Sequence, residues 1–231
     1  MKITWLGHAA FLLEGSMKVL IDPFLTGNPN APVKPEDVEA DYIVVTHGHG
    51  DHLGDAVEIA KKNEAPVVCI HELSRILAKK DVEAVGMNMG GTLRTGSIAV
   101  TMVPAWHSAD VEDEQGNIIS AGMSAGVVVS MDGVRVYHTG DTDVFLDMQL
   151  IGELHKPDVM LVPIGDYYTM GIAGAVKALE LVRPKVAIPM HYNTFPLIEK
   201  DPEDFRKAVK AKGLNVEVVI LNPGESYEFS R

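Results

Sequence analysis

The sequence has only one cysteine among its 231 residues. One thiol cannot form an intrachain disulfide, and it cannot supply a pair of cysteine ligands to a metal. A disulfide-stabilised secreted fold and a cysteine-based zinc motif are therefore both excluded. Cys69 lies in the apolar stretch 66–70, and we expect it to be an inert residue of the core.

Long apolar runs are also missing. No segment approaches the roughly 20 apolar residues that a membrane-spanning helix needs. Residues 1–15 lack both the uninterrupted apolar stretch and the small-residue cleavage site of a signal peptide. We therefore expect a soluble, cytoplasmic protein with no membrane partner.

Positive charge is scarce. The chain has 20 Lys and Arg residues against 32 Asp and Glu, which gives a formal net charge of -12. Such a charge repels phosphate backbones and anionic lipid, so it disfavours a nucleic-acid partner. We expect a small-molecule substrate instead. The sequence leaves the oligomeric state open, and a homo-oligomer is compatible with it.

The length and pattern of the chain indicate an α/β fold. We expect one domain over 1–231, built of two similar halves at about 1–90 and 91–231, each with antiparallel strands first and strand-helix units after. This order favours two mixed sheets packed face to face with helices outside, although a single doubly wound sheet is also compatible with it. The expected helices cover 54–63, 71–80, 143–155, 173–183 and 202–213.

The most informative motif is "THGHGDH", which follows an apolar strand predicted over 41–47. Side chains two positions apart in extended backbone point the same way, so His47 and His49 can face one point. Asp51 and His52 lie at the entry to the next helix, where a turn can aim them at a second point nearby. Imidazole and carboxylate are the ligands that Zn²⁺ prefers, so the motif predicts metal binding.

Three further polar residues follow apolar strands. His107, Asp141 and His191 each stand where a strand ends, and open α/β sheets place their chemistry at strand ends. A shared carboxylate can hold two cations about 3.5–4 Å apart. The seven side chains divide into one site of His47, His49 and His107, and another of Asp51, His52 and His191, with Asp141 reaching both.

The motifs "THGHGDH", "TGDT" and "PMHYN" together with His107 resemble the metallo-β-lactamase superfamily and its H-x-H-x-D-H pattern. The stretches "ITWLGHAAFLLEG", "MGGT" and "PIGDYYTMG" are similar to those of the small bacterial metal-dependent hydrolases of undefined substrate, relatives of ascorbate-6-phosphate lactonase. The resemblance covers essentially the whole chain. It implies a four-layer αββα sandwich with a binuclear metal site at one edge of the two sheets.

The expected activity is hydrolysis, in which a metal-bound hydroxide attacks an ester, lactone, amide or phosphoester. Zinc is the ion we expect, and the same ligands also serve manganese, iron or nickel. Asp51 is expected to orient the hydroxide as well as to bind metal. The resemblance places His8 near the metals, as a proton donor or substrate contact and not as a ligand.

Several neighbouring residues have expected supporting roles. The resemblance suggests that Asp22 supports the histidine motif from beneath. We expect His138 to be a packing residue or a neighbour of a ligand, and Asp166 to be a partner of a ligating histidine. Tyr168 is a candidate for the pocket lining, and Tyr192 for either a substrate contact or a turn.

Three other kinds of protein share features with the expected hydrolase. A nuclease of the same fold would need local positive charge, and salt-dependent RNA binding would favour it. A non-catalytic metal-binding module would keep the ligands without turnover. An amidohydrolase barrel, which also carries an H-x-H motif, needs about 250 residues and eight regular strand-helix repeats, which this chain does not show.

Overall fold

The computed structural model describes residues 1–113 and 115–230, and its core is a pair of seven-stranded sheets. The first sheet has the order β16-β1-β2-β3-β4-β5-β6, with strands β1 Lys2–Trp5, β2 Phe11–Glu14, β3 Lys18–Ile21, β4 Tyr42–Val44, β5 Val67–Ile70, β6 Ala84–Met87 and β16 Ser226–Glu228. The second sheet has the order β15-β14-β13-β12-β11-β8-β7, with strands β7 Thr92–Thr95, β8 Ile98–Pro104, β11 Ala125–Met131, β12 Val134–His138, β13 Val159–Pro163, β14 Val186–Met190 and β15 Glu217–Val218.

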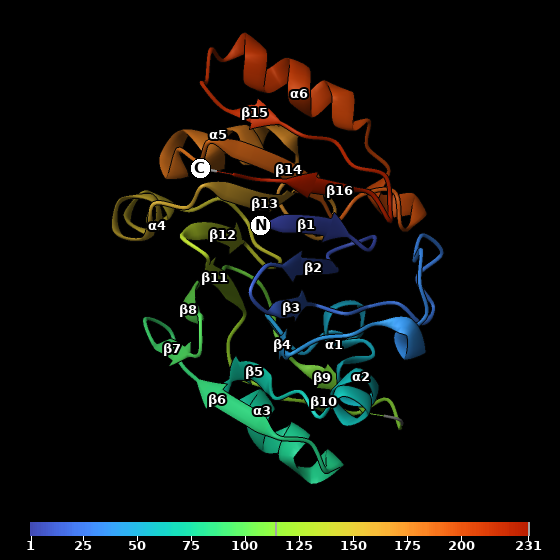
Figure 1. Cartoon of the computed structure of the whole chain (residues 1–231). Helices are drawn as coiled ribbons and strands as arrows, with labels where there is room; N and C mark the ends of the chain where they lie inside the picture. The colour runs from blue at the N-terminus through green and yellow to red at the C-terminus, as the bar shows by residue number, and fades with distance from the viewer. Residues whose placement is uncertain (114, 231) are drawn as a thin grey trace.

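Both sheets are mixed, and helices cover their outer faces. Strands β3 to β6 run parallel, as do β12 to β15, and the remaining neighbours in each sheet pair antiparallel. Helices α2 and α3 lie beside the first sheet, and α4, α5 and α6 beside the second (Figure 1). The helices are α1 Gly50–Leu53, α2 Ala56–Asn63, α3 His71–Leu77, α4 Met148–His155, α5 Ile172–Val182 and α6 Pro202–Ala211, with short 3-10 turns η1 Pro35–Asp37, η2 Ala78–Lys80 and η3 Pro196–Ile198. The expected αββα sandwich is confirmed, and no barrel of strand-helix repeats is formed by the described residues.

Burial explains the composition of the parallel strands. All residues of β5, β13 and β14 are buried, because helices cover one face of each sheet and the other sheet covers the opposite face. In antiparallel β2, by contrast, buried and half-buried positions alternate. Cys69 lies fully buried in β5, as expected for an inert core residue.

The two ends of the chain meet in the first sheet. Strand β16 pairs antiparallel with β1, with Ile3 opposite Tyr227, and the amino group of Met1 donates to the carbonyl oxygen of Phe229 at 2.9 Å. Figure 1 shows red β16 beside blue β1. The C-terminal strand therefore closes the sheet built by the N-terminal part of the chain.

Some predicted boundaries were wrong. The helix expected over 143–155 begins only at Met148, because the Thr142 hydroxyl donates to the carbonyl oxygen of Asp143 and the Asp143 carboxylate accepts from the backbone N–H of Val144, which competes with helix formation. Strand β6 and the separate ribbon of β9 (Val111–Glu112) and β10 (Ile118–Ile119) were not foreseen, since they are short or partly exposed.

Helix length also bears on the membrane question. Within the described ranges, none of the helices combines the length and the apolarity that a bilayer crossing requires.

Candidate metal centre

The structure gathers the predicted site residues at one edge of the two sheets. They follow β1, β4, β8, β12 and β14, so segments from both sheets converge. The carboxyl ends of parallel strands meet at such an edge, which is why residues far apart in sequence become neighbours. The ligand atoms fall into three overlapping groups, each within 4.8 Å: His47, His49 and His107; His47, His52 and Asp141; and His8, Asp51, His52 and His191.

The first group consists of three imidazoles. The Nε2 atom of His47 lies 3.0 Å from Nδ1 of His49, and the rings of both lie about 5 Å from that of His107, at 5.2 and 5.1 Å between centroids. The other nitrogen of His49, Nε2, lies 3.3 Å from the Ser108 hydroxyl. This leaves Nδ1 of His49 and Nε2 of His47 facing the same point.

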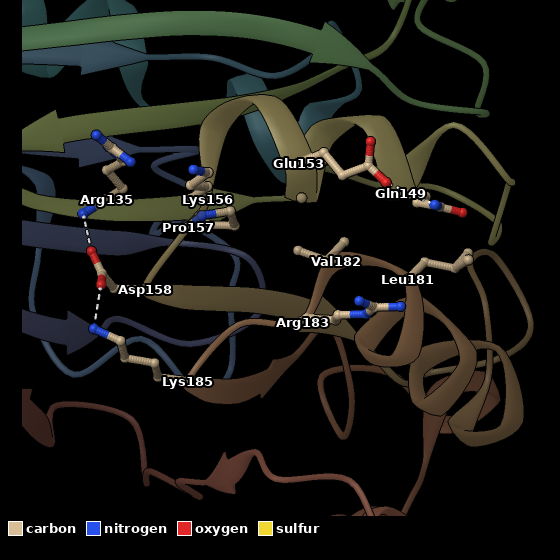
Figure 2. Close-up of a pocket in the computed structure, with 11 residues that line it drawn as sticks. Arg135, Gln149, Glu153, Lys156, Pro157, Asp158, Leu181, Val182, Arg183 and Lys185 are labelled. Atoms are coloured by element: carbon tan, nitrogen blue, oxygen red, sulfur yellow. Dashed lines mark hydrogen bonds and ion pairs between the residues drawn. The ribbon is translucent and has the colours of Figure 1, made fainter.

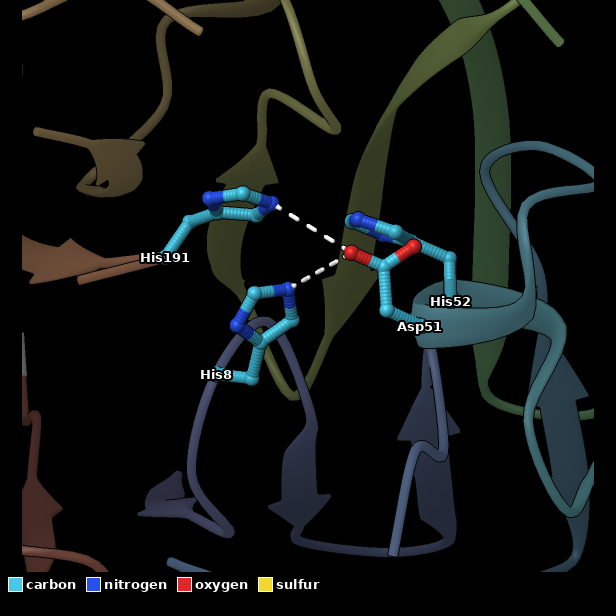
Figure 3. Close-up of side chains that lie close together, drawn as sticks. All are labelled: His8, Asp51, His52 and His191. Atoms are coloured by element: carbon cyan, nitrogen blue, oxygen red, sulfur yellow. Dashed lines mark hydrogen bonds and ion pairs between the residues drawn. The ribbon is translucent and has the colours of Figure 1, made fainter. Parts of the chain in front are cut away.

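The group of His8, Asp51, His52 and His191 is arranged around the Asp51 carboxylate. Figure 3 shows His8 and His191 both directed at the Asp51 carboxylate, with His52 beside it. Oδ2 of Asp51 lies 3.0 Å from Nε2 of His8 and 3.8 Å from Nε2 of His191. Asp141 joins this group to the three imidazoles, because its Oδ2 lies 3.0 Å from Nε2 of His191 and 3.6 Å from Nε2 of His107.

Asp22 fixes the orientation of two histidines from beneath. Its buried carboxylate accepts from Nδ1 of His52 at 2.7 Å and from the Thr46 hydroxyl at 2.6 Å. Because that hydroxyl donates to Asp22, its oxygen is left to accept from Nδ1 of His47, which lies 3.0 Å away. With Nδ1 of both histidines engaged in this way, Nε2 is the atom through which each would bind a metal. The supporting role expected of Asp22 is confirmed.

Buried atoms without partners show that the residues fit a metal. Nε2 of His52, Oδ1 of Asp141 and both nitrogens of His191 have no hydrogen-bond partner although they are buried. Unsatisfied buried polar atoms are costly and rare in folded proteins. Imidazole nitrogens and a carboxylate oxygen facing one another across such short distances are the donor set of a Zn²⁺ or related site.

The charges of these groups are strongly coupled. Burial, with the nearby His191, lowers the pKa of His8 to about 4, so its imidazole is neutral at pH 7. Burial also acts on His191, but the carboxylates of Asp141 and Asp51 outweigh it and raise the pKa of His191 to about 9. Burial would raise the pKa of Asp51, yet the nearby imidazole of His191 and the hydrogen bond from His8 hold it well below its usual value.

The backbone at the site is held in unusual conformations. His8, Asp22 and His191 have φ of 54°, 46° and 55°, in the left-handed region that non-glycine residues seldom adopt. The backbone N–H of His191 donates to the carbonyl oxygen of His8 at 3.0 Å, so the two strained loops, one from each sheet, support each other. Gly140, at φ 62°, has no room for a Cβ, which would collide with the carbonyl oxygen of Ala125.

His138 joins the loop of His8 to the loop of Asp141 without facing the centre. Its Nε2 donates to the carbonyl oxygen of Ala9 at 2.8 Å, and its Nδ1 accepts from the backbone N–H of Gly140 at 3.0 Å. The ring is fully buried, which matches the expectation of a packing residue next to a ligand.

Two expected roles were wrong. Asp166 is exposed and pairs with Lys200, at 3.1 Å between Oδ2 and Nζ, so it does not support a histidine. Tyr192 is buried and stacks on Trp5, with centroids 5.4 Å apart, so it belongs to the core. Sequence reasoning also missed Thr194, whose hydroxyl lies 2.8 Å from Nδ1 of His8. Its only signal was its place three residues after a strand-end histidine.

A pocket of about 690 Å³ opens onto the centre. Its lining includes the predicted Tyr168 and the candidate ligands His49, His107, Asp51 and Asp141. A reacting group of a substrate can therefore reach the candidate ligands from solvent.

A second pocket lies at the opposite ends of the strands (Figure 2). It has a volume of about 550 Å³ and is lined in part by Arg135, Lys156, Arg183 and Lys185. The Asp158 carboxylate binds the backbone N–H of Arg135 and the Nζ atom of Lys185, each at 3.0 Å. Lys185 precedes β14, and the far end of that strand leads to His191, so this pocket is separate from the centre.

A comparison with protein families places the chain. The sequence profile of the beta-lactamase superfamily domain matches residues 2–191, a range that includes all eight candidate site residues. The chain belongs to this superfamily. As a superfamily member it also has the fold expected from the resemblance, the metallo-β-lactamase sandwich.

Within this superfamily, the chain is similar to several individual proteins. The chain is 89% identical over 231 residues, all of both chains, to a UPF0173 metal-dependent hydrolase of Archaeoglobus fulgidus. It is 39% identical to Igni18, a metallo hydrolase of Ignicoccus hospitalis, whose structure superposes with a TM-score of 0.89 over 99% of each chain. An isothiocyanate hydrolase from Delia radicum gut bacteria shares the fold, with a TM-score of 0.78 and 18% identity over 100% of this chain and 99% of the other.

Proposed function

We propose that this protein is a hydrolase that holds a pair of divalent metal ions, with zinc as the expected ion. The observation that carries the proposal is the convergence of buried nitrogen and oxygen atoms that have no hydrogen-bond partner. Its family of metal-dependent hydrolases supports the same activity. The proposed ligands are His47, His49 and His107 for one ion, and Asp51, His52 and His191 for the other, with Asp141 shared.

The protein side chains have distinct tasks in hydrolysis. When bound, the ions would act as Lewis acids that lower the pKa of a water molecule from about 15.7 towards about 7. Asp51 borders the pocket and can accept a hydrogen bond from that water, which orients its lone pair towards the substrate. The cleaved ester, lactone, amide or phosphoester leaves a group that needs a proton.

The attacking water supplies that proton, and His8, whose imidazole is neutral at pH 7, is proposed to donate a hydrogen bond beside the reacting group. Asp51 is ionised and can only accept, so Nε2 of His8 carries a proton, while Nδ1 accepts from the Thr194 hydroxyl. The ring is thereby held with its N–H directed at the acidic centre. Replacing His8 removes a hydrogen-bond donor without removing one of the seven proposed ligands.

We expect His8→Ala to bind the full complement of metal and to lower kcat by about 10²- to 10³-fold, the usual effect of removing one hydrogen-bond donor to the reacting atoms. Elemental analysis and steady-state kinetics on the same preparation measure both quantities. If the variant instead loses one ion, His8 is a ligand, in keeping with its place within 4.8 Å of Asp51, His52 and His191.

The function itself is tested by metal analysis joined to a substrate screen. Protein purified without oxygen should contain a pair of ions per chain and hydrolyse aryl esters, lactones or phosphodiesters, and chelation should abolish turnover. If the protein binds zinc, manganese, iron and nickel but hydrolyses no substrate with any of them, the result would favour a non-catalytic binding module. Salt-dependent binding and cleavage of RNA would favour a nuclease, which the net charge of -12 opposes.

A further inference from the structure

The pocket at the candidate metal centre has an apolar wall. It is formed by Tyr168, Phe195, Pro196 and Leu197. Leu197 is 54% exposed, although it belongs to a short 3-10 turn whose Ile198 is fully buried. Apolar side chains that line a pocket this way recognise a ligand by covering its apolar surface.

This wall is preformed. The loop that carries it is closed at its base by Asn193, whose backbone N–H donates to the carbonyl oxygen of Ile198 at 3.0 Å. The Asn193 side chain accepts from the backbone N–H of Lys200 at 2.8 Å. The Phe195 ring packs edge-on against His8, with centroids 5.6 Å apart, and lies 6.4 Å from that of Phe24. A ligand would therefore meet a fixed surface.

Positive charge is absent from the described residues that line this pocket. Lys200 follows the wall in sequence, but it forms an ion pair with Asp166. The adjoining hollow on the other side of His49 is bordered by Asp110 and Glu112. A phosphate or carboxylate held away from the metals would meet no cationic partner here and two acidic neighbours.

We infer that the substrate carries an uncharged, apolar acyl, alkyl or aryl group, which lies against Tyr168, Phe195 and Leu197 while its scissile bond faces the metal centre. This inference rests on the proposed function, because it names the substrate class of the same site. It excludes phosphorylated sugars and other substrates that carry a distal anion.

Binding to the metal-free protein tests the wall independently of catalysis. Calorimetric titration would compare hexanamide, octanamide and suberamate, which has the length of octanamide but ends in a carboxylate. Two added methylenes should tighten binding by roughly tenfold, since each buried methylene contributes about 0.8 kcal/mol. Suberamate should bind at least tenfold more weakly than octanamide. Equal affinity for all three, or a preference for suberamate, would overturn the inference.

A matched pair of variants locates the effect. Leu197→Lys should remove the preference for octanamide over suberamate, because it adds a cation and removes apolar surface at the wall. Leu150→Lys is the control, since Leu150 is 51% exposed on α4 and does not line the pocket. The inference fails if Leu197→Lys keeps the wild-type preference, or if Leu150→Lys changes it equally.

Kinetics with the metal-loaded protein separates this inference from the proposed function. Nitrophenyl esters of hexanoate, octanoate and suberate should show the same order in kcat/KM. Hydrolysis that is indifferent to chain length and end charge would contradict the substrate class and leave the hydrolase intact. No hydrolysis, together with the expected binding order, would contradict the hydrolase and leave the apolar recognition site standing.

Discussion

At the scale of single residues, Asp22 shows how a buried carboxylate can orient a metal centre that it does not enter. Its oxygens accept from the backbone and hydroxyl of Thr46 and from Nδ1 of His52. Through Thr46 it also fixes the tautomer of His47. A change at Asp22 should therefore act on metal binding through two histidines at once.

We expect Asp22→Asn to weaken metal binding by roughly 10- to 100-fold, the usual effect of removing a partner of a ligand. An amide has one acceptor oxygen in place of two, so it leaves at least one of the donors unpaired. Metal affinity would be measured by competition with a chromogenic chelator. Asp132→Asn is the control, because Asp132 is exposed and accepts from the backbone N–H of Ser16. Unchanged affinity in Asp22→Asn would contradict the orienting role.

Protonation of the ligands gives a second expectation. Opposing carboxylates raise the pKa of His191 to about 9 and that of His52 well above its usual value, so both are protonated in the metal-free chain near neutral pH. Metal binds only neutral imidazole, so loading should release protons from both residues.

Near pH 7 we expect about two protons released per fully loaded chain, and fewer as the pH rises through about 9, because His191 is then already neutral. Calorimetry in buffers of different ionisation enthalpy measures this number. A count that stays at zero near pH 7 would show that these histidines are neutral or do not bind metal.

At the scale of secondary-structure elements, the ends of the strands carry the site. The alternation and apolar runs of the sequence predicted most strands, and the motif after β4 predicted that four ligands lie together. Sequence could not predict the short β6 or the late start of α4, since local side-chain hydrogen bonds decide such boundaries. It also missed that Thr194 holds His8, because that contact joins residues 186 positions apart.

Gly140 is a junction between elements where a larger residue does not fit. It turns the chain between β12 and Asp141 at φ 62°, and a Cβ would meet both Ala125 and Thr46. We expect Gly140→Ala to lower the free energy of unfolding by roughly 2–4 kcal/mol and to reduce metal content, through strain and a displaced Asp141.

Gly133→Ala is the matched control. Gly133 also has positive φ, at 78°, but a Cβ there would meet nothing within 4 Å. It should therefore cost only about 1 kcal/mol and leave the metal content unchanged. Denaturant unfolding and elemental analysis of both variants check the comparison, and equal effects would contradict the packing argument for Gly140.

At the scale of the whole molecule, the candidate centre joins the two sheets. Its residues follow β1 and β4 of one sheet and β8, β12 and β14 of the other, so bound ions would link both sheets. Family resemblance predicted this sandwich, whereas the residues alone left a doubly wound sheet open. The closure of the first sheet by β16 depends on pairing between the two chain ends, which no local pattern reveals. The organisation of 1–231 as one domain of two halves stays a prediction.

The central claim is that seven side chains from both sheets hold a pair of metal ions. Crystals of zinc-loaded protein, measured at the zinc absorption edge, test it directly. The account predicts two anomalous peaks about 3.5–4 Å apart. Each should lie roughly 2.0–2.2 Å from the nitrogens and oxygens of its proposed ligands. No peak between the sheets, or peaks that leave His107, Asp141 and His191 uncoordinated, would contradict it.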